Sequence, residues 1–224
     1  MIFDNPTTRS YARLTGSFYL GIAVFGAFAI GYVPSQIVVD GDAAATLANV
    51  TARRGLFNAG IGADALVMML EVMTTTMIYQ MFRRVNETLA FAAALARFGM
   101  VAVMGAMLLL HGGLLSLAKV GGDPALAQIL LDAHHSGVWI WQVFFTLHLW
   151  LLGTLVIRSG LYPRLLGLGL VIGGTGYLLD SLYSFAFPDA SALGYLRIGL
   201  LVIVTLSEVG FALWLVVRGP RGAQ

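Results

Sequence analysis

Four residues that ionise in water recur at one depth in four apolar segments: Glu71, Arg97, His148 and Glu208. Counted from segment ends that we expect on one side of a membrane, each lies roughly 15 Å deep at 1.5 Å per residue. A charged side chain at the centre of a membrane helix costs about 2.5–3.5 kcal/mol, so such groups normally face other helices and pair. Arg97 needs a carboxylate, and both Glu71 and Glu208 lie at its depth. The pattern predicts a buried ion-pair layer of Glu71, Arg97 and Glu208.

One arginine neutralises only one acid, so the second acid of this layer must be protonated or balanced by a cationic His148. A spare titratable acid beside a histidine is typical of proton-handling and metal-binding sites. The alternative is structural, because Arg–Glu pairs and hydrogen-bonded histidines also hold membrane helices together. The residues alone leave both interpretations open.

A second polar layer is expected nearer the outer membrane face, and it contains Asp64, His111 and Asp180. On the segment that holds Asp180, neighbouring polar residues follow helical spacing and form one stripe. Two facing carboxylates favour a bound cation, a cationic ligand or a shared proton. We therefore predict a ligand pocket open to the outer face and lined by Asp64, His148, Tyr177, Asp180 and Ser181.

The same region could supply ligands to a divalent metal, namely Asp64, His111, His148 and Asp180. No His-x-x-x-His or Glu-x-x-His spacing supports this set, and a haem held by His111 and His148 is a weaker alternative. The chain has no cysteine, which excludes disulfides, thiolate metal sites and cysteine nucleophiles. Serine hydrolase motifs, phosphate-binding loops and dinucleotide fingerprints are absent. Both the cofactor and the question of enzymatic activity stay open.

The elements that position these residues must be membrane helices. The chain is 58% hydrophobic and 11% charged, whereas soluble domains carry about 25% charged residues. A net charge of +2 is too small to suggest a nucleic-acid partner. We predict an all-α polytopic membrane protein, a single domain over 1–224 with six transmembrane helices in a bundle and two short interfacial helices. The spans are expected at about 11–33, 56–82, 88–118, 138–158, 164–187 and 193–217, and the interfacial helices at 43–54 and 125–135.

The arginines predict the orientation, because cytoplasmic loops carry an excess of Lys and Arg. The loops and ends on the side of the N-terminus are the more basic ones. The bases there are Arg9, Arg13, Arg83, Arg84, Arg158, Arg164, Arg218 and Arg221. We expect an integral membrane protein with both termini in the cytoplasm and the lipid bilayer as its partner.

Several stretches resemble a large bacterial family of membrane proteins known as domain of unknown function 4386. They are DGDAAAT at 40–46, LHL at 147–149, RSG at 158–160 and GYLLDS at 176–181. The resemblance extends over nearly the whole chain, and His111 does not match the pattern. Positions that match it include Asp64, Arg97, His134, His148, Asp180 and Glu208. The resemblance implies a multi-span fold and a location in a bacterial cytoplasmic (inner) membrane, and it implies no reaction.

Three functions fit these observations. The favoured one is a small-ligand or metal-binding pocket, which could be catalytic, open to the outer face. The second is a proton-coupled small-molecule transporter with Glu71, His148 and Glu208 as its relay. The third is a structural or accessory subunit of a larger membrane complex, in which the polar layer holds the helices together. The partner besides lipid would then be a small molecule or another membrane protein.

Overall fold

The computed structural model of the chain describes residue 3 and residues 5–222, and all regular structure in this part is helical. Within these residues, six helices are long and apolar enough to cross a membrane. They cover Arg9–Ile37, Arg54–Phe82, Glu87–Lys119, Pro124–Ser159, Arg164–Ala186 and Ser191–Val217. The protein is therefore an integral membrane protein, and the predicted all-α architecture with six spans is confirmed.

The first span consists of three consecutive pieces: α1 (Arg9–Gly26), the π-helical η2 (Ala27–Tyr32) and α2 (Val33–Ile37). Pro34 lies in the first turn of α2. Proline has no N–H, and its ring would clash with the carbonyl four residues earlier in a regular α-helix. The wider π turns directly before Pro34 accommodate it without ending the span.

A short helix, α3 (Ala43–Ala52), connects the first span to α4 (Arg54–Phe82). The carboxylate of Asp42 caps α3 by accepting a hydrogen bond from the backbone N–H of Ala45 at 2.8 Å. An aspartate at this position satisfies a backbone donor that the helix itself leaves free. The short helix that we predicted after Asp42 is thus confirmed.

The prediction of a second separate short helix at 125–135 is wrong. These residues form the first part of α6 (Pro124–Ser159), one continuous helix of 36 residues. The expected gap between this helix and the span at 138–158 fell at Ser136 and Gly137, but Gly137 lies where α6 passes close to α5 (Glu87–Lys119). A Cβ at Gly137 would lie 2.4 Å from Cγ of Met107, so glycine here permits close helix packing. At 1.5 Å per residue, α6 is about 54 Å long and extends beyond a hydrocarbon layer of about 30 Å.

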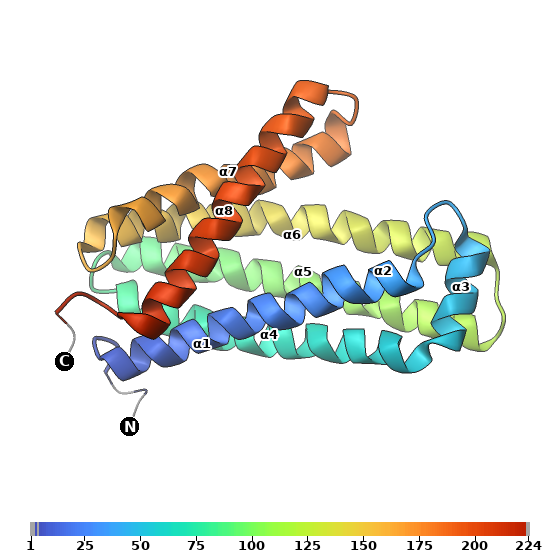
Figure 1. The fold of residues 1–224 in the computed structure, drawn as a ribbon, viewed down its shortest axis with the longest axis horizontal. Coiled ribbons are helices and arrows are strands. Elements are labelled where there is room, and N and C mark those ends of the chain that lie inside the picture. Colours follow the sequence, from blue (N-terminus) through green and yellow to red (C-terminus); the bar gives the residue numbers. More distant parts are fainter. Residues whose placement is uncertain (1–2, 4, 223–224) are drawn as a thin grey trace.

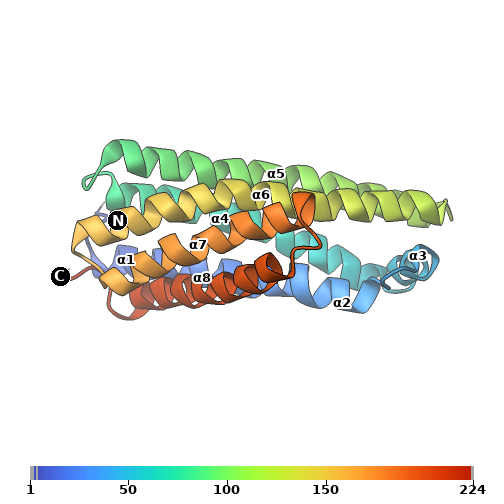
Figure 2. The same cartoon turned by 90° about the horizontal axis from the view of Figure 1, so that it is seen from above.

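The last two helices, α7 (Arg164–Ala186) and α8 (Ser191–Val217), form a hairpin. Each long helix packs against its neighbour in the chain, and α1 closes the ring by packing against both α4 and α8. The hairpin diverges from the other helices toward the end remote from the termini (Figure 1). Seen from above, α7 and α8 run beside α6 and α1 (Figure 2). The N- and C-termini lie at the same end of the molecule (Figure 1).

Candidate functional site

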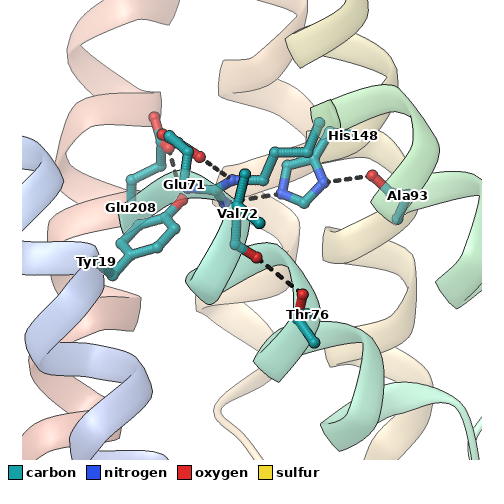
Figure 3. A network of polar contacts seen from close by, with 8 residues as sticks. Tyr19, Glu71, Val72, Thr76, Ala93, His148 and Glu208 are labelled. Carbon is teal, nitrogen blue, oxygen red and sulfur yellow. Dashed lines mark hydrogen bonds and ion pairs between the residues drawn. The ribbon is translucent and has the colours of Figure 1, made fainter. Parts of the chain in front are cut away.

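Arg97 of α5 lies at the centre of a buried polar network and is 1% exposed. Its Nε donates a hydrogen bond of 2.5 Å to Oε2 of Glu71 on α4, which makes a buried ion pair. Its Nη1 lies 3.1 Å from Nε2 of His148 on α6 (Figure 3). The sequence left two acids open as the partner of Arg97, and the structure pairs it with Glu71.

The contacts of His148 determine its protonation state. A guanidinium can only donate hydrogen bonds, so Nε2 of His148 must accept from Arg97. The other ring nitrogen, Nδ1, lies 2.9 Å from the carbonyl oxygen of Ala93, which can only accept. Nδ1 therefore carries the proton, and the imidazole is neutral. The cationic His148 that we considered from the sequence is not compatible with these contacts, and neither ring nitrogen has a lone pair left for a metal ion.

Glu208 of α8 receives hydrogen bonds from two tyrosines rather than from Arg97. The hydroxyl of Tyr19 on α1 donates to Oε1 at 2.7 Å, and the hydroxyl of Tyr177 on α7 donates to Oε2 at 3.4 Å. The ring of Tyr19 also lies beneath the guanidinium, with 4.6 Å between Cζ of Arg97 and the ring centroid. Tyr19 thus joins the ion pair to Glu208 (Figure 3).

Tyr19 was missing from the residues that we selected from the sequence. The available signal was a phenol about 15 Å into an apolar span, counted from Arg9 at 1.5 Å per residue. This is the depth of the four ionisable residues of the layer. A tyrosine in that position has to find a partner for its hydroxyl.

A central cavity of about 240 Å³ lies beside this network, and all six spans contribute to its wall. Its polar lining comes mainly from Tyr19, Glu71, Arg97, Tyr177 and Glu208. The remaining wall is mostly apolar or aromatic. It consists of Leu20, Ile22, Ala23, Gly26, Ile30, Val67, Met100, Met104, Trp141, Phe145, Thr205, Val209 and Ala212. Polar groups that converge on an otherwise apolar cavity are typical of small-molecule sites.

Asp180 and Ser181 of α7 are used in contacts between helices and do not line this cavity. Asp180 forms an ion pair with Arg197 of α8 and accepts a hydrogen bond of 2.9 Å from Nε2 of Gln142 on α6. The hydroxyl of Ser181 lies 2.8 Å from the carbonyl oxygen of Trp139 and 3.1 Å from Oε1 of Gln142. These contacts fasten α7 to α6 and α8.

Asp64 of α4 lines a different and much smaller cavity of about 20 Å³, together with His134 and three methionines, and Asp180 is not part of its wall. The five residues predicted to line one pocket, namely Asp64, His148, Tyr177, Asp180 and Ser181, therefore do not line a common cavity. Of these five residues only Tyr177 lines the central cavity, whereas Glu71, Arg97 and Glu208 all do. Helical rise predicts the depth of a residue, but the side to which it points depends on the rotation of its helix.

The predicted metal ligands Asp64, His111, His148 and Asp180 do not converge either. His111 stacks on His134 with 4.0 Å between ring centroids, and His148 binds Arg97 and Ala93. Within residues 3 and 5–222, no group of three or more His, Asp or Glu side chains is arranged to hold a metal ion. The residues present thus fit neither the divalent metal nor the haem considered from the sequence.

Comparison with known sequences identifies the family. The chain matches the family described as "Domain of unknown function (DUF4386)" over residues 14–219. The chain belongs to this family. It is also 30% identical, over 158 residues, to an "Uncharacterized protein" of Archaeoglobus fulgidus, covering 70% of this chain and 81% of that relative. No solved structure matches the chain. The resemblance seen in the sequence is confirmed.

The DUF4386 match includes every residue of the polar network, from Tyr19 to Glu208. The central cavity is therefore built entirely from the part of the chain that defines the family.

Proposed function

We propose that the protein binds a small molecule in the central cavity between its six spans. The observation that carries this proposal is a space of about 240 Å³ beside Arg97, Glu71 and Glu208, deep in the membrane-spanning part. Charged and phenolic side chains from several helices converge on this otherwise apolar space, which is the pattern of small-molecule sites.

The rim of the cavity supports entry of the ligand from the lipid. Ala23, Ile30, Thr205 and Val209 line the cavity and are also exposed on the outside of the helix bundle. They come from α1 and η2 on one side and from α8 on the other. Helix α1 approaches α8 closely at Gly16, where a Cβ would lie 2.7 Å from the carbonyl oxygen of Ala212. The two helices diverge toward the end remote from the termini (Figure 1). A mouth on the flank of a membrane-spanning bundle favours a lipid-soluble ligand.

The contacts of the network favour binding over the two alternative functions. A proton relay through Glu71, His148 and Glu208 would need a histidine with a free nitrogen, and both nitrogens of His148 are bonded. A purely structural subunit would need the ion pair but not the cavity. The binding proposal accounts for both features.

The proposal predicts that filling the cavity abolishes binding. Gly26 lines the cavity, and a Cβ there would meet no atom within 4 Å, so Gly26→Leu adds bulk at the cavity wall without a steric clash. At Gly31, in the same span, a Cβ would also meet no atom within 4 Å, but Gly31 does not line the central cavity. We expect decyltrimethylammonium, 1-decanol or decanoate to raise the melting temperature of the purified protein in lipid nanodiscs. The rise should persist in Gly31→Leu and disappear in Gly26→Leu.

The matched pair of variants separates binding from a general effect of the probes on the bilayer, which would be the same in both. If none of the three probes raises the melting temperature of the wild-type protein, the proposed function is wrong. An equal rise in Gly26→Leu and Gly31→Leu would place binding outside the central cavity and would also contradict it.

We further propose that both termini lie in the cytoplasm, with the protein in the cytoplasmic membrane. The basic turn between α4 and α5, with Arg83 and Arg84, lies at the same end of the molecule as the two termini (Figure 1). Basic residues are in excess on the cytoplasmic side of membrane proteins, which supports this orientation. Because the chain lacks cysteine, single cysteines can be introduced without background. A membrane-impermeant maleimide added to intact cells should label Asp189→Cys, in the turn between α7 and α8. It should label Arg84→Cys only after lysis. Labelling of Arg84→Cys in intact cells would mean that the termini lie on the opposite side of the membrane.

A further inference from the structure

The charges around the central cavity do not balance. Its lining contains two carboxylates, Glu71 and Glu208, and one cationic side chain, Arg97. Glu71 is paired with Arg97, and the contacts of His148 make that histidine neutral. Both oxygens of Glu208 accept hydrogen bonds from tyrosine hydroxyls, an arrangement that suits an ionised carboxylate. Glu208 is half-buried and lies in a membrane-spanning helix. A charge at such a depth is costly without a counterion, so Glu208 requires a positive charge from elsewhere.

Aromatic rings line the same cavity. Trp141 lies 6.0 Å from Phe145 and 6.1 Å from Tyr177, and Phe145 lies 5.4 Å from Tyr177, measured between ring centroids. Tyr19 and Phe145 already face the guanidinium of Arg97, at 4.6 and 5.6 Å. Clusters of this kind bind organic ammonium groups through the negative faces of the rings. The cavity thus combines an aromatic cluster with an unpaired carboxylate.

Resting on the binding function proposed above, we infer that the cavity takes the head group of a lipid-soluble organic cation, an alkylammonium compound. The head group lies between Glu208, Trp141 and Tyr177, and the alkyl chain leaves through the mouth between α1 and α8 into the lipid. The available space supports this division of the ligand. At about 240 Å³ the cavity is many times larger than the space of about 10–15 Å³ that holds one water, enough for a trimethylammonium head and a few methylenes.

The other head-group charges fit the lining less well. An anion would face two carboxylates and would have to compete with Glu71 for Arg97. A neutral head group would leave Glu208 without a counterion, so the acid would have to take up a proton. Selectivity for a cation over its neutral and anionic analogues is therefore the property to measure.

The test uses three probes with the same ten-carbon chain: decyltrimethylammonium, 1-decanol and decanoate. Each is titrated against the purified protein in nanodiscs of a zwitterionic lipid, with the melting temperature as the readout. We expect decyltrimethylammonium to bind most tightly. Glu208→Gln keeps the shape and the acceptor for Tyr19 but removes the charge, and it should weaken decyltrimethylammonium binding about tenfold or more. Glu87→Gln, outside the cavity at the start of α5, should bind like the wild type.

A second variant keeps the inference testable if Glu208→Gln does not fold. Trp141→Leu retains an apolar wall but removes an aromatic face, so it should weaken decyltrimethylammonium several-fold more than 1-decanol. The inferred ligand class is wrong if 1-decanol or decanoate binds as tightly as decyltrimethylammonium. It is also wrong if Glu208→Gln and Trp141→Leu bind decyltrimethylammonium with unchanged affinity. In both cases the proposed binding function is retained. If none of the three probes binds, the proposed binding function itself is wrong.

Discussion

Replacing Arg97 with alanine is expected to lower the free energy of unfolding by about 3–5 kcal/mol, the usual cost of breaking a buried ion pair from one side. The change removes the donor to Oε2 of Glu71 and the donor to Nε2 of His148 at once. Both acceptors would then be buried without a partner, Glu71 at 3% and His148 at 1% exposure. The loss can be measured by reversible denaturation in mixed micelles.

Double variants identify the acid on which this loss depends. Arg97→Met combined with Glu71→Leu replaces the pair with apolar side chains and should recover much of the stability. Arg97→Met combined with Glu208→Leu leaves Glu71 unpaired and should not recover it. Arg84→Ala, at an exposed position, is the control and should change the stability by less than about 0.5 kcal/mol. A neutral Arg97→Ala would mean that the pair contributes nothing to folding.

Gly173→Ala is expected to separate the two helices of the α7–α8 hairpin and to cost about 1–3 kcal/mol, the range for overpacking a close contact. A Cβ at Gly173 would lie 2.5 Å from the backbone N and 2.7 Å from Cα of Val204 on α8. A side chain could rotate away, but the backbone of a helix can move only as a unit. Because Tyr177 and Glu208 lie on these two helices, the variant should also weaken probe binding.

The matched control is Gly199→Ala on α8, where a Cβ would meet no atom within 4 Å. Alanine is favoured over glycine inside a helix by about 1 kcal/mol at most, so this variant should keep or slightly raise the stability. Thermal melting of the two variants side by side gives the comparison. Equal stability of Gly173→Ala and Gly199→Ala would show that α7 and α8 tolerate a wider separation than their contact suggests.

Both the architecture and the depths of the polar residues could be predicted from the sequence. Six apolar stretches with few charges must be spanning helices, because a bilayer satisfies no backbone hydrogen bonds. Within such a helix the rise per residue is constant, so counting residues predicted that Glu71, Arg97 and His148 share one depth. In the structure Arg97 contacts both of the other two. Depth is a local property, set by hydrogen bonds between residues four apart in the chain.

The direction of each side chain around its helix axis could not be predicted in this way. The tertiary structure pairs Asp180 with Arg197 and Gln142 and places Asp64 at a small cavity that Asp180 does not line, so the outer pocket drawn from these acids is not formed. It also forms one continuous helix through Gly137, where we expected a short helix and a span to be separate. Rotation and crossing of helices depend on residues that meet from distant parts of the chain, such as Gly173 against the backbone of Val204. Those contacts, and the cavity that remains between them, are decided only when all six spans pack together.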